Sequence, residues 1–439
     1  MTQALDKYTA ALDSDLQPYR INGKVSQVIG LVIEADGPTA SIGEICDLEH
    51  HGQPAGRAEV VGFKNNKTLL MPLGEMAGIR PGLDVVATGR PLKIHIGASL
   101  LGRVVDGLGN PLDGKGPLST DASRAVFAIP PNPLLRRRIS EPMLTGIRTI
   151  DGMLTLGKGQ RIGIFAGSGV GKSVMLGMIA RHCLAKVNVI ALIGERGREV
   201  KEFIERDLGE EGLKRSVVVV ATSDQPALIR LKGALTATTI AEYFRDLGHD
   251  VMLLLDSTTR IAMAQREIGL ATGEPPATKG YTPSVFAFLP RLLERAGMSD
   301  KGSITGMYTV LVEGDDMDEP IADAMRAILD GHVVLSRALA QKNHYPAVDV
   351  LGSISRVMPD VTDPEHRKAA RRLLSLMAEY RAAEDLITIG AYAKGSNAEV
   401  DKAIGIMPDV NKFLRQEVNE KTDFADIVTT LKTLAGKTG

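Results

Sequence analysis

The segment that follows the apolar run Arg161–Phe165 reads Ala-Gly-Ser-Gly-Val-Gly-Lys-Ser and ends at Ser173. Glycines at this spacing between a strand and a helix let backbone N–H groups wrap a polyphosphate. A helix that begins near Gly171 adds the positive end of its dipole. Lys172 can neutralise the β- and γ-phosphates, and the Ser173 hydroxyl can ligate Mg²⁺. The segment therefore predicts a site for ATP with Mg²⁺.

The nucleotide-binding residues that this segment predicts are Gly167, Ser168, Gly169, Val170, Gly171, Lys172, Ser173 and Val174. The strict pattern of a phosphate-binding loop begins with glycine, whereas this chain has Ala166 at that position. We expect alanine to be tolerated, because only the later glycines have to approach phosphate. A chance Gly-Lys-Ser in a glycine-rich turn is the alternative, and the strand–loop–helix setting disfavours it.

Two acids follow apolar runs further along the chain. Asp256 ends the run Val251–Leu255, a position that suits coordination of Mg²⁺ through water, although by itself it would also suit a helix cap. Glu195 follows the run Val187–Ile193. Because parallel strands deliver their carboxyl ends to one crevice, Glu195 can polarise a water for in-line attack on the γ-phosphate. Without the phosphate loop, Glu195 would be a solvated acid in a charged run; with it, the pattern predicts hydrolysis.

Strands and helices alternate from about residue 145 to 345, and these elements would position the site. The apolar runs are continuous rather than alternating, so we expect burial on both faces, in a mainly parallel sheet covered by helices. The expected strands are Arg161–Phe165, Val187–Ile193, Ser216–Ala221 and Val251–Leu255.

Different patterns flank this α/β region. Short β-type runs from about 20 to 92 predict a small barrel or sandwich, and a Gly- and Pro-rich connector with little regular structure is expected at 107–142. The expected β-runs are Lys24–Ile33, Arg57–Phe63, Thr68–Met71 and Asp84–Thr88. Beyond about residue 360 the chain is expected to be helical, most clearly at Pro364–Glu379 and Val400–Val418.

Residues 1–18 predict one short amphipathic helix. Its apolar face consists of Leu5, Tyr8, Leu12 and Leu16. A helix of this length is marginal alone and has to dock. It either packs on its own domain or serves as a handle for a partner.

Composition excludes several classes of function. Lys plus Arg is 52 and Asp plus Glu is 53, a balance that does not indicate a nucleic-acid binder, and we expect no nucleic-acid partner. Cys46 and Cys183 stand outside any Cys/His cluster, which disfavours a zinc site or a disulfide framework. The absence of a signal-like start and of a run near 20 apolar residues predicts a cytoplasmic protein.

These motifs together resemble the catalytic β subunit of rotary F-type ATP synthases and, more closely, the type III export ATPases. The resemblance covers about residues 20–435. Its landmarks are Gly167–Ser173, Gly194–Glu199, Asp256–Arg260, Tyr345–Asp349 and Ser353–Met358. The segments Glu274–Phe286, Leu289–Arg295 and Asp316–Asp323 are similar to the export branch, in which the flagellar ATPases come first and the virulence-secretion ATPases second.

The resemblance implies a role for each catalytic candidate. Lys172 and Ser173 would bind phosphate and Mg²⁺, Asp256 would complete the metal site through water, and Glu195 would activate the attacking water. Arg196 and Arg260 match arginines that line the nucleotide pocket in the family.

Two further residues enter only through the resemblance. Tyr345 matches an aromatic residue that packs on adenine, with a core tyrosine beside Pro346 as the alternative. Arg356 matches an arginine that a neighbouring subunit directs toward the γ-phosphate, where such a finger stabilises charge in the transition state. Taken alone, Arg356 would be a surface arginine in an ion pair.

The family also implies an architecture and partners. The expected parts are the N-terminal helix 1–18, a β-barrel at 19–92, a RecA-like ATPase domain at 93–350 and a C-terminal helical domain at 351–439, assembled as a homohexamer. The implied partners are a stator-like negative regulator at the N-terminal helix, a central stalk-like coiled coil, export-gate membrane proteins and chaperone–substrate complexes. The implied location is the cytoplasmic side of the inner-membrane export apparatus.

Three functions follow as hypotheses: a protein-export ATPase, a rotary ATP synthase subunit, and a catalytically silent ring subunit. Glu195 opposes the silent subunit, because an acid at that position serves hydrolysis. The C-terminal stretch Glu384–Tyr392 lacks the acidic run of the synthase subunit, which puts coupling to a synthase-type shaft in doubt. The export ATPase is therefore preferred, with flagellar export ahead of virulence secretion.

Overall fold

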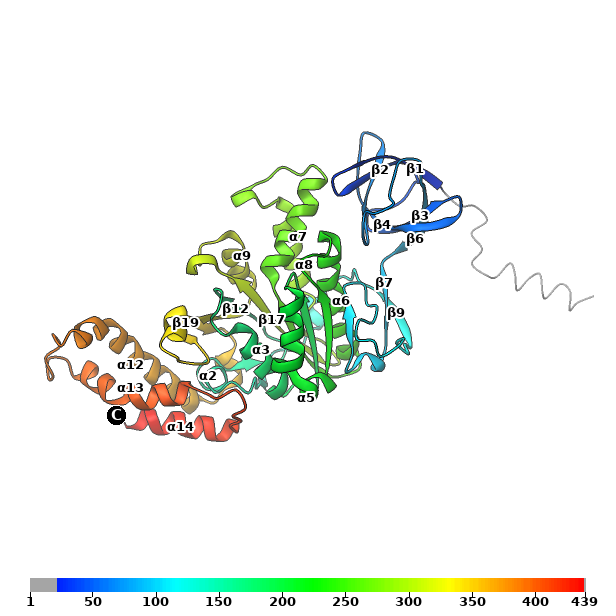
Figure 1. Ribbon diagram of the computed structural model, residues 1–439. Coiled ribbons are helices and arrows are strands. Elements are labelled where there is room, and N and C mark those ends of the chain that lie inside the picture. Colours follow the sequence, from blue (N-terminus) through cyan, green and yellow to red (C-terminus); the bar gives the residue numbers. More distant parts are fainter. Residues whose placement is uncertain (1–21, 438–439) are drawn as a thin grey trace, which may run out of the picture. The chain divides into compact units, whose positions relative to one another are not determined.

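Figure 1 shows the computed structural model of the chain, which describes residues 22–437. The helix predicted at 1–18 lies outside these residues. The chain divides into two compact units. One holds the residues up to Leu92 with Ala271–Gly273, and the other holds Lys93–Leu270 and the chain from Glu274 onward. None of the helices within 22–437 is long and apolar enough to cross a membrane.

The first unit contains a closed six-stranded β-barrel with the strand order β1–β2–β5–β4–β3–β6. Its strands are β1 (Asn22–Ile29), β2 (Val32–Asp36), β3 (Glu44–His50), β4 (Gln53–Lys64), β5 (Lys67–Pro72) and β6 (Asp84–Pro91). Ile33, Leu48 and Leu70 are fully buried inside it, as expected for side chains that point to one face of a strand. The barrel prediction is confirmed.

Two details of the expected strands are wrong. The run Lys24–Ile33 is not one strand, because Gly30 and Leu31 form the turn of the hairpin between β1 and β2. Strand β3 was not expected at all. Its sequence Glu-Ile-Cys-Asp-Leu-Glu-His mixes polar and apolar residues without strict alternation, so its pattern alone does not indicate a strand.

The second unit is built on a nine-stranded sheet with the order β19–β18–β12–β17–β15–β13–β14–β8 and the short β16 beside β17. The strands are β8 (Val104–Asp106), β12 (Arg161–Ala166), β13 (Val187–Ile193), β14 (Ser216–Ala221), β15 (Asp250–Asp256), β16 (Gly297–Met298), β17 (Ser303–Leu311), β18 (Gly331–Leu335) and β19 (Val348–Ser355). Only β16 and β19 pair antiparallel with their neighbours. The predicted, mainly parallel sheet is confirmed.

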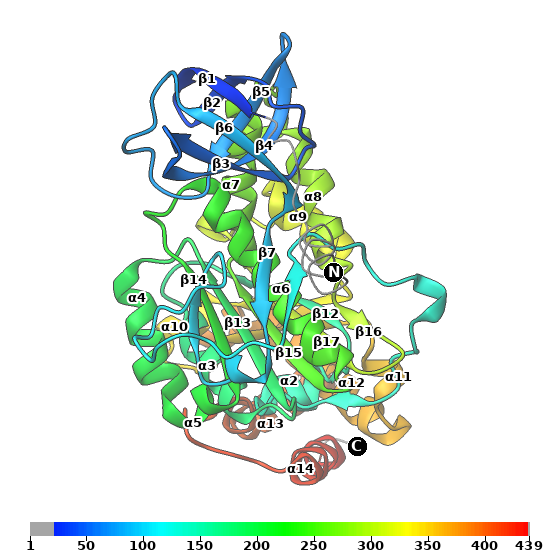
Figure 2. The ribbon, with the colours of Figure 1, turned by 90° about the vertical axis from the view of Figure 1, so that its right-hand side faces the viewer.

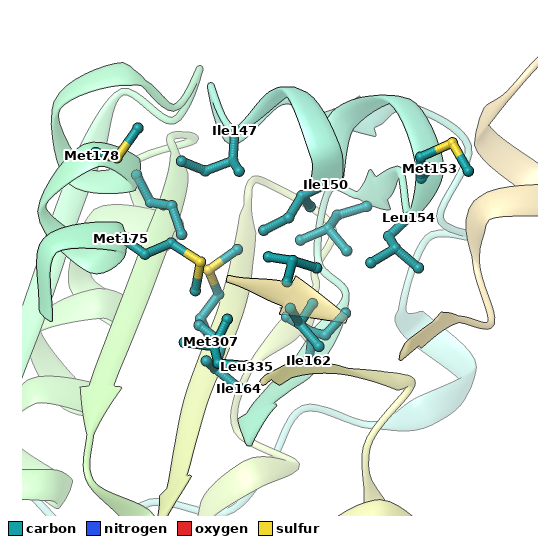
Figure 3. Close-up of a cluster of buried hydrophobic side chains, with 14 of the residues drawn as sticks. Ile147, Ile150, Met153, Leu154, Ile162, Ile164, Met175, Met178, Met307 and Leu335 are labelled. Atoms are coloured by element: carbon teal, nitrogen blue, oxygen red, sulfur yellow. The ribbon is translucent and has the colours of Figure 1, made fainter. Parts of the chain in front are cut away.

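Helices cover both faces of this sheet. On one face, Ile162 and Ile164 of β12 join a buried cluster with α2 (Arg148–Met153) and α3 (Lys172–His182), and Figure 3 shows Ile147 and Met175 of that cluster. On the other face, α6 (Ala227–Asp246) packs closely enough that a Cβ at Gly233 would lie 2.7 Å from Ile193 Cδ1. Burial on both faces explains why the strands read as continuous apolar runs.

The remaining elements of the second unit are shorter. Its helices before residue 362 are α2 (Arg148–Met153), α3 (Lys172–His182), α4 (Gly197–Glu202), α5 (Gly209–Lys214), α6 (Ala227–Asp246), α7 (Thr258–Ala271), α8 (Pro283–Leu293), α9 (Pro320–Ile328), α10 (Arg337–Gln341) and α11 (Met358–Val361), with a π-helical turn at Phe203–Leu208. Two small sheets pair β7 (Lys93–Ile96) with β9 (Ala122–Ala125) and β10 (Pro142–Met143) with β11 (Leu156–Gly157). Short 3₁₀ turns lie at Ala98–Leu100, Pro133–Leu135, Thr278–Gly280 and Glu313–Asp315.

The chain after residue 362 is helical, as predicted. It forms α12 (Pro364–Thr388), α13 (Ala398–Leu414) and α14 (Phe424–Gly436). Asp363 and Asn397 cap the first two by accepting hydrogen bonds from backbone N–H groups of the first turn. Leu373, Val410 and Leu431 from the three helices join the same buried cluster as α2 and α3. The helical part therefore packs on α2 and on β19, the edge strand of the sheet.

Candidate nucleotide site

A cavity of about 610 Å³ lies at the carboxyl edge of the parallel strands, between the segments that follow β12, β13, β17 and β18. The predicted residues that line it are Gly167, Ser168, Gly169, Gly171, Lys172, Ser173, Val174, Glu195, Arg196 and Arg260. Val170, which the sequence also placed among the nucleotide-binding residues, is buried in the core instead. The cavity has the place expected for a ligand of an open parallel sheet.

The phosphate loop turns sharply between β12 and α3. Gly169 and Gly171 adopt φ values of +78° and +84°, a region in which side chains other than glycine are strained. Helix α3 begins at Lys172, directly after Gly171. The unpaired N–H groups of its first turn therefore face the cavity end of the helix, where they can bind an anion.

The Lys172 ammonium lies between two acids. It contacts Asp256 Oδ1 and is 3.7 Å from Glu195 Oε1. Asp256 also accepts a hydrogen bond from Thr309 Oγ1 at 2.6 Å. The side chains of Lys172 and Asp256 are 12% and 5% exposed, so their charges interact with little screening by solvent.

Glu195 stands at the end of β13 with a second cation beside it. Arg260 Nε is 3.5 Å from Glu195 Oε1. Burial raises the pKa of Glu195 to about 7; the Asp256 carboxylate adds to the rise, and the ammonium of Lys172 opposes it. A carboxyl group with such a pKa can take up or release a proton near neutral pH.

The two pocket arginines differ in their surroundings. Arg196 directly precedes α4, has a largely exposed side chain, and pairs with Glu199 at 3.3 Å. The side chain of Arg260 is one-third exposed, and its Nε is buried beside Glu195 without a hydrogen bond. Because Arg260 lines the cavity, its guanidinium can offer positive charge to a bound anion.

Tyr345 lies beside the phosphate loop, after α10. The tyrosine is 41% exposed, and its ring comes within 3.3 Å of the point where a Cβ at Gly171 would stand. It therefore presents an open aromatic face next to the cavity rather than filling a core.

Arg356 does not line this cavity, because the fold holds it at the other end of the parallel strands. It follows β19, and its backbone N–H donates to the carbonyl of Asp330 at 3.1 Å. Asp330 pairs with Arg161, the first residue of β12, whereas the phosphate loop follows the last residue of β12. Six residues of strand separate the two ends by about 17 Å, which is longer than an arginine side chain.

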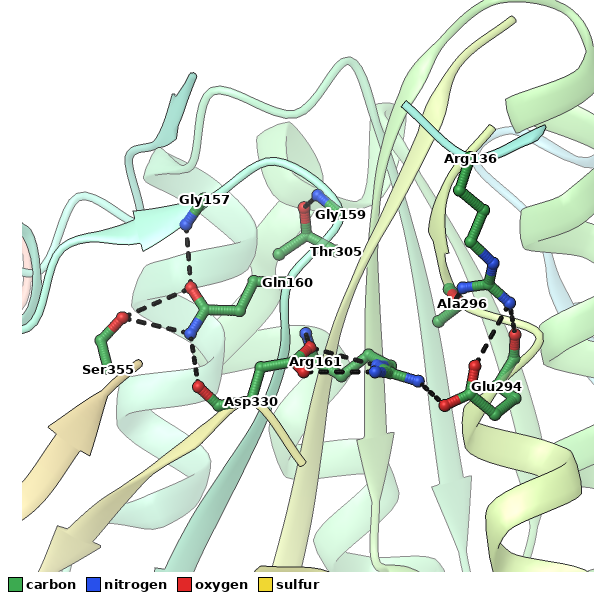
Figure 4. A network of polar contacts seen from close by, with 10 residues as sticks. All are labelled: Arg136, Gly157, Gly159, Gln160, Arg161, Glu294, Ala296, Thr305, Asp330 and Ser355. Carbon is green, nitrogen blue, oxygen red and sulfur yellow. Dashed lines mark hydrogen bonds and ion pairs between the residues drawn. The ribbon is translucent and has the colours of Figure 1, made fainter. Parts of the chain in front are cut away.

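A polar network fixes the amino-terminal end of β12, where Arg356 lies. Figure 4 shows Gln160 donating to the carbonyl of Asp330 and to Ser355 Oγ, each at 3.1 Å. Arg161 also pairs with Glu294 after α8. In Figure 2, α11, which follows Arg356, lies on the other side of the sheet from α4 and α10 at the cavity.

Sequence reasoning missed several residues at the cavity. Glu199, Arg337 and the segment Leu311–Gly314 also line it, and Thr309 stands behind Asp256. Leu311 is the last residue of β17, and 312–314 follow it. No strand was expected there. Had one been, the rule that ligands bind at the carboxyl ends of parallel strands would have pointed to this segment. Nothing in the sequence marks Arg337, because its place depends on β18 lying next to β12.

Family models account for most of the chain. Models of the ATP synthase alpha/beta family match the β-barrel domain at residues 25–89 and the nucleotide-binding domain at residues 146–355. A model of the T3SS EscN ATPase C-terminal domain matches residues 362–433.

Relatives match along nearly the whole length. The flagellum-specific ATP synthase of Bacillus subtilis (strain 168) is 58% identical over 426 residues, which cover 95% of this chain and 96% of that protein. The type 3 secretion system ATPase of Xanthomonas euvesicatoria is 52% identical over 410 residues, which cover 93% of each chain.

Solved structures agree with these relatives. The assembled ATPase EscN from the type III secretion system of enteropathogenic E. coli superposes with a TM-score of 0.89 at 46% identity, covering 94% of this chain and 100% of that one. EscN in complex with its central stalk EscO gives a TM-score of 0.87, also at 46% identity and with the same coverage. The chain thus belongs to the ATP synthase alpha/beta family, among the flagellar and type III secretion ATPases, and is an ATPase.

Proposed function

We propose that the chain hydrolyses ATP with Mg²⁺ as a subunit of a homohexameric ring that energises flagellar protein export. The observation that carries the hydrolytic part is the environment of Glu195. This carboxylate is largely buried, has a pKa raised to about 7, and lies within 4 Å of both Lys172 and Arg260 at a phosphate-loop cavity. The flagellar part rests on the 58% identity to a flagellum-specific ATP synthase.

The loop residues bind the phosphates. Backbone N–H groups from Gly167 to Val174 would hold the α- and β-phosphates, and Lys172 would turn from Asp256 toward the β- and γ-phosphates. The exposed ring of Tyr345 beside Gly171 would stack on the adenine.

The residues present fit a magnesium ion. Ser173 lies in the first turn of α3 at the cavity, and the buried Asp256 carboxylate already accommodates one cation, the Lys172 ammonium. Mg²⁺ is commonly held by one or two protein ligands together with phosphate and water. When bound, it neutralises charge on the β- and γ-phosphate oxygens.

Glu195 would act on the attacking water. In its ionised form it can accept a hydrogen bond from a water in line with the γ-phosphate and take up a proton as the oxygen attacks. Lys172 and Arg260 hold the carboxylate in place before the nucleotide arrives. Arg196 and Arg260 also offer charge to the phosphates from the cavity wall.

Arg356 would act on the nucleotide of a neighbouring subunit. It is exposed and lies at the edge of the sheet opposite its own phosphate loop, so it cannot serve its own site. The same edge continues into the segment between β9 and β10, whose Ile139 packs near Val357 around Gly157. That segment exposes Phe127, Ile129, Leu134 and Leu135, an apolar surface that favours contact with another copy.

The remaining partners follow from the family. EscN is known with its central stalk EscO, and we infer a similar stalk-like coiled coil for this chain. A stator-like negative regulator would bind the helix predicted at 1–18. Chaperone–substrate complexes and membrane proteins of the export gate would meet the ring at the cytoplasmic side of the inner membrane.

Virulence secretion is the second candidate, favoured by the 52% identity to a type 3 secretion system ATPase. A deletion in the organism that encodes this chain separates the two. We expect loss of exported flagellar proteins, rescued by the wild-type gene and not by Glu195→Gln. Loss of secreted effectors with intact flagellar export would establish the second candidate instead.

The purified variant tests the chemistry. Glu195→Gln should bind ATP within about twofold of wild type but release phosphate at least 100-fold more slowly, the scale of a lost general base. Glu202→Gln, on the exposed side of α4, is the matched control and should keep full turnover. Near-normal phosphate release by Glu195→Gln would overturn the assigned role.

A further inference from the structure

Gln416, just beyond the end of α13, is a buried amide whose polar atoms are all used. The residue is 6% exposed. Its Oε1 accepts from the backbone N–H of Arg148 at 2.7 Å, and its Nε2 donates to the carbonyls of Gly146 and Glu420, each at 2.9 Å. Because an N–H can only donate and a carbonyl can only accept, these partners fix the orientation of the amide. The side chain thus holds one position between two parts of the fold.

The backbone of Gln416 is connected, through Tyr345, to the start of α3, the helix that follows the phosphate loop. Its N–H donates to the carbonyl of Tyr345 at 2.9 Å. The ring of that tyrosine lies within 3.3 Å of the Cβ position of Gly171, the residue before α3. Tyr345 is therefore connected to the C-terminal helices by its carbonyl and to the loop by its ring.

The side chain of Gln416 is connected, through Gly146, to the other end of the same helix. Its partner Gly146 has a φ of +78°, and a Cβ there would come within 2.4 Å of the Cβ of His182. His182 is the last residue of α3. Gly146 is itself fixed, because its N–H donates to the buried Asp151 carboxylate at 2.9 Å. Gln416 alone thus contacts both Tyr345, at the start of α3, and Gly146, at the end of α3.

Neighbouring bonds join the same segment to α2 without touching Tyr345. Thr149 Oγ1 donates to the carbonyl of Leu414 at 2.8 Å. The Arg148 guanidinium donates to the carbonyl of Arg415 at 2.5 Å and pairs with Glu420 at 2.7 Å. If Gln416 served only to attach α13, its loss and the loss of the Thr149 bond would have the same consequences.

We propose that Gln416 is a positioning residue for base recognition: it holds the carbonyl of Tyr345, and through it the aromatic ring, at the phosphate loop. This inference rests on the proposed stacking of Tyr345 on adenine. It makes the C-terminal helices part of the nucleotide site, since a shift of the end of α13 moves the ring that contacts the base. The phosphate subsite, which the loop itself forms, does not depend on Gln416.

The test compares a ligand with a base and one without. In the full chain carrying Glu195→Gln, Kd is measured for ATP and for inorganic tripolyphosphate. Gln416→Leu keeps the side-chain volume but removes the three side-chain hydrogen bonds. It should raise the Kd of ATP about tenfold, the scale of one stacked base. Tripolyphosphate should keep its Kd within about twofold, because it has no base. Gln416→Asn is measured beside it and carries the test if the leucine variant does not fold.

Two controls decide the interpretation. Thr149→Val removes the neighbouring bond and should change neither Kd. In a Tyr345→Ala chain, Gln416→Leu should cause no further loss for ATP, because both act through one ring. An equal rise in the Kd of ATP and of tripolyphosphate, or the same effect from Thr149→Val, would overturn the role of Gln416. If Tyr345→Ala itself leaves ATP binding unchanged, the stacking assigned to Tyr345 fails, whatever Gln416 does.

Discussion

Glu195 combines burial, two neighbouring cations and a nearby carboxylate in one side chain. Burial raises the pKa of its carboxyl group, whereas the charges of Lys172 and Arg260 lower it. With Asp256 also close by, the balance leaves its pKa near 7. This is the range in which a carboxylate is basic enough to accept a proton and still ionised in a large share of molecules.

A pH dependence follows at the same scale. Because the free enzyme must carry ionised Glu195, and a carboxyl group with a raised pKa loses its proton only as pH climbs past that value, kcat/KM should rise with pH through about 7. The measurement is kcat/KM for ATP on both sides of neutrality. The Kd of ATP for Glu195→Gln over the same range serves as control and shows any titration of the nucleotide itself. A kcat/KM that stays flat through neutrality would contradict this role.

At the scale of elements, β17 supports the acid of its neighbour. It lies between β12, which precedes the phosphate loop, and β15, which ends at Asp256. Thr309 of β17 donates to Asp256 at 2.6 Å and thereby fixes the carboxylate that would face the metal. Partners of this kind orient a metal ligand without touching the metal.

Removal of the Thr309 hydroxyl should raise the concentration of Mg²⁺ that the ATPase requires. We expect Thr309→Val to raise the Mg²⁺ concentration for half-maximal ATPase activity about tenfold, the lower end of the range for such partners. Thr305→Val is the matched control on the same strand, since Thr305 accepts from the N–H of Gly159 instead. A Mg²⁺ titration in which both variants match wild type would count against the supporting role of β17.

The sequence indicated those elements whose signal is local. The loop from Gly167 to Ser173 and the strands that end at Glu195 and Asp256 follow from glycine spacing and apolar runs. Strand β17 was harder to see, because Thr305, Gly306 and Thr309 interrupt its apolar pattern although the strand is buried almost throughout. Its polar residues are there to contact neighbours, which only the strand order reveals.

The placement of Arg356 shows a second limit. Its position in the sequence does not show at which end of the parallel strands it lies. That depends on β19 pairing antiparallel with β18, with Ser355 opposite Gly331. Only the resemblance to a family pointed to Arg356, and only the register explains why its own nucleotide is out of reach.

For the whole molecule, the two proposed parts of the hydrolytic site lie at opposite ends of the parallel strands of one chain. The cavity with Glu195 opens at the carboxyl edge of the sheet, and Arg356 stands at the opposite edge. A single chain therefore cannot bring them together. A closed ring of identical chains can, because each head-to-tail contact places the second face of one copy on the first face of the next.

Mixing two inactive variants tests this claim most directly. Glu195→Gln rings should be inactive, and Arg356→Ala rings should be slower by a thousandfold or more, roughly the contribution of an arginine finger. Subunits mixed in equal amounts, with mixed rings verified by native mass spectrometry, should regain about a quarter of wild-type phosphate release, since each site needs Glu195 from one copy and Arg356 from the next. Mixed rings that stay inactive would contradict a site shared between subunits.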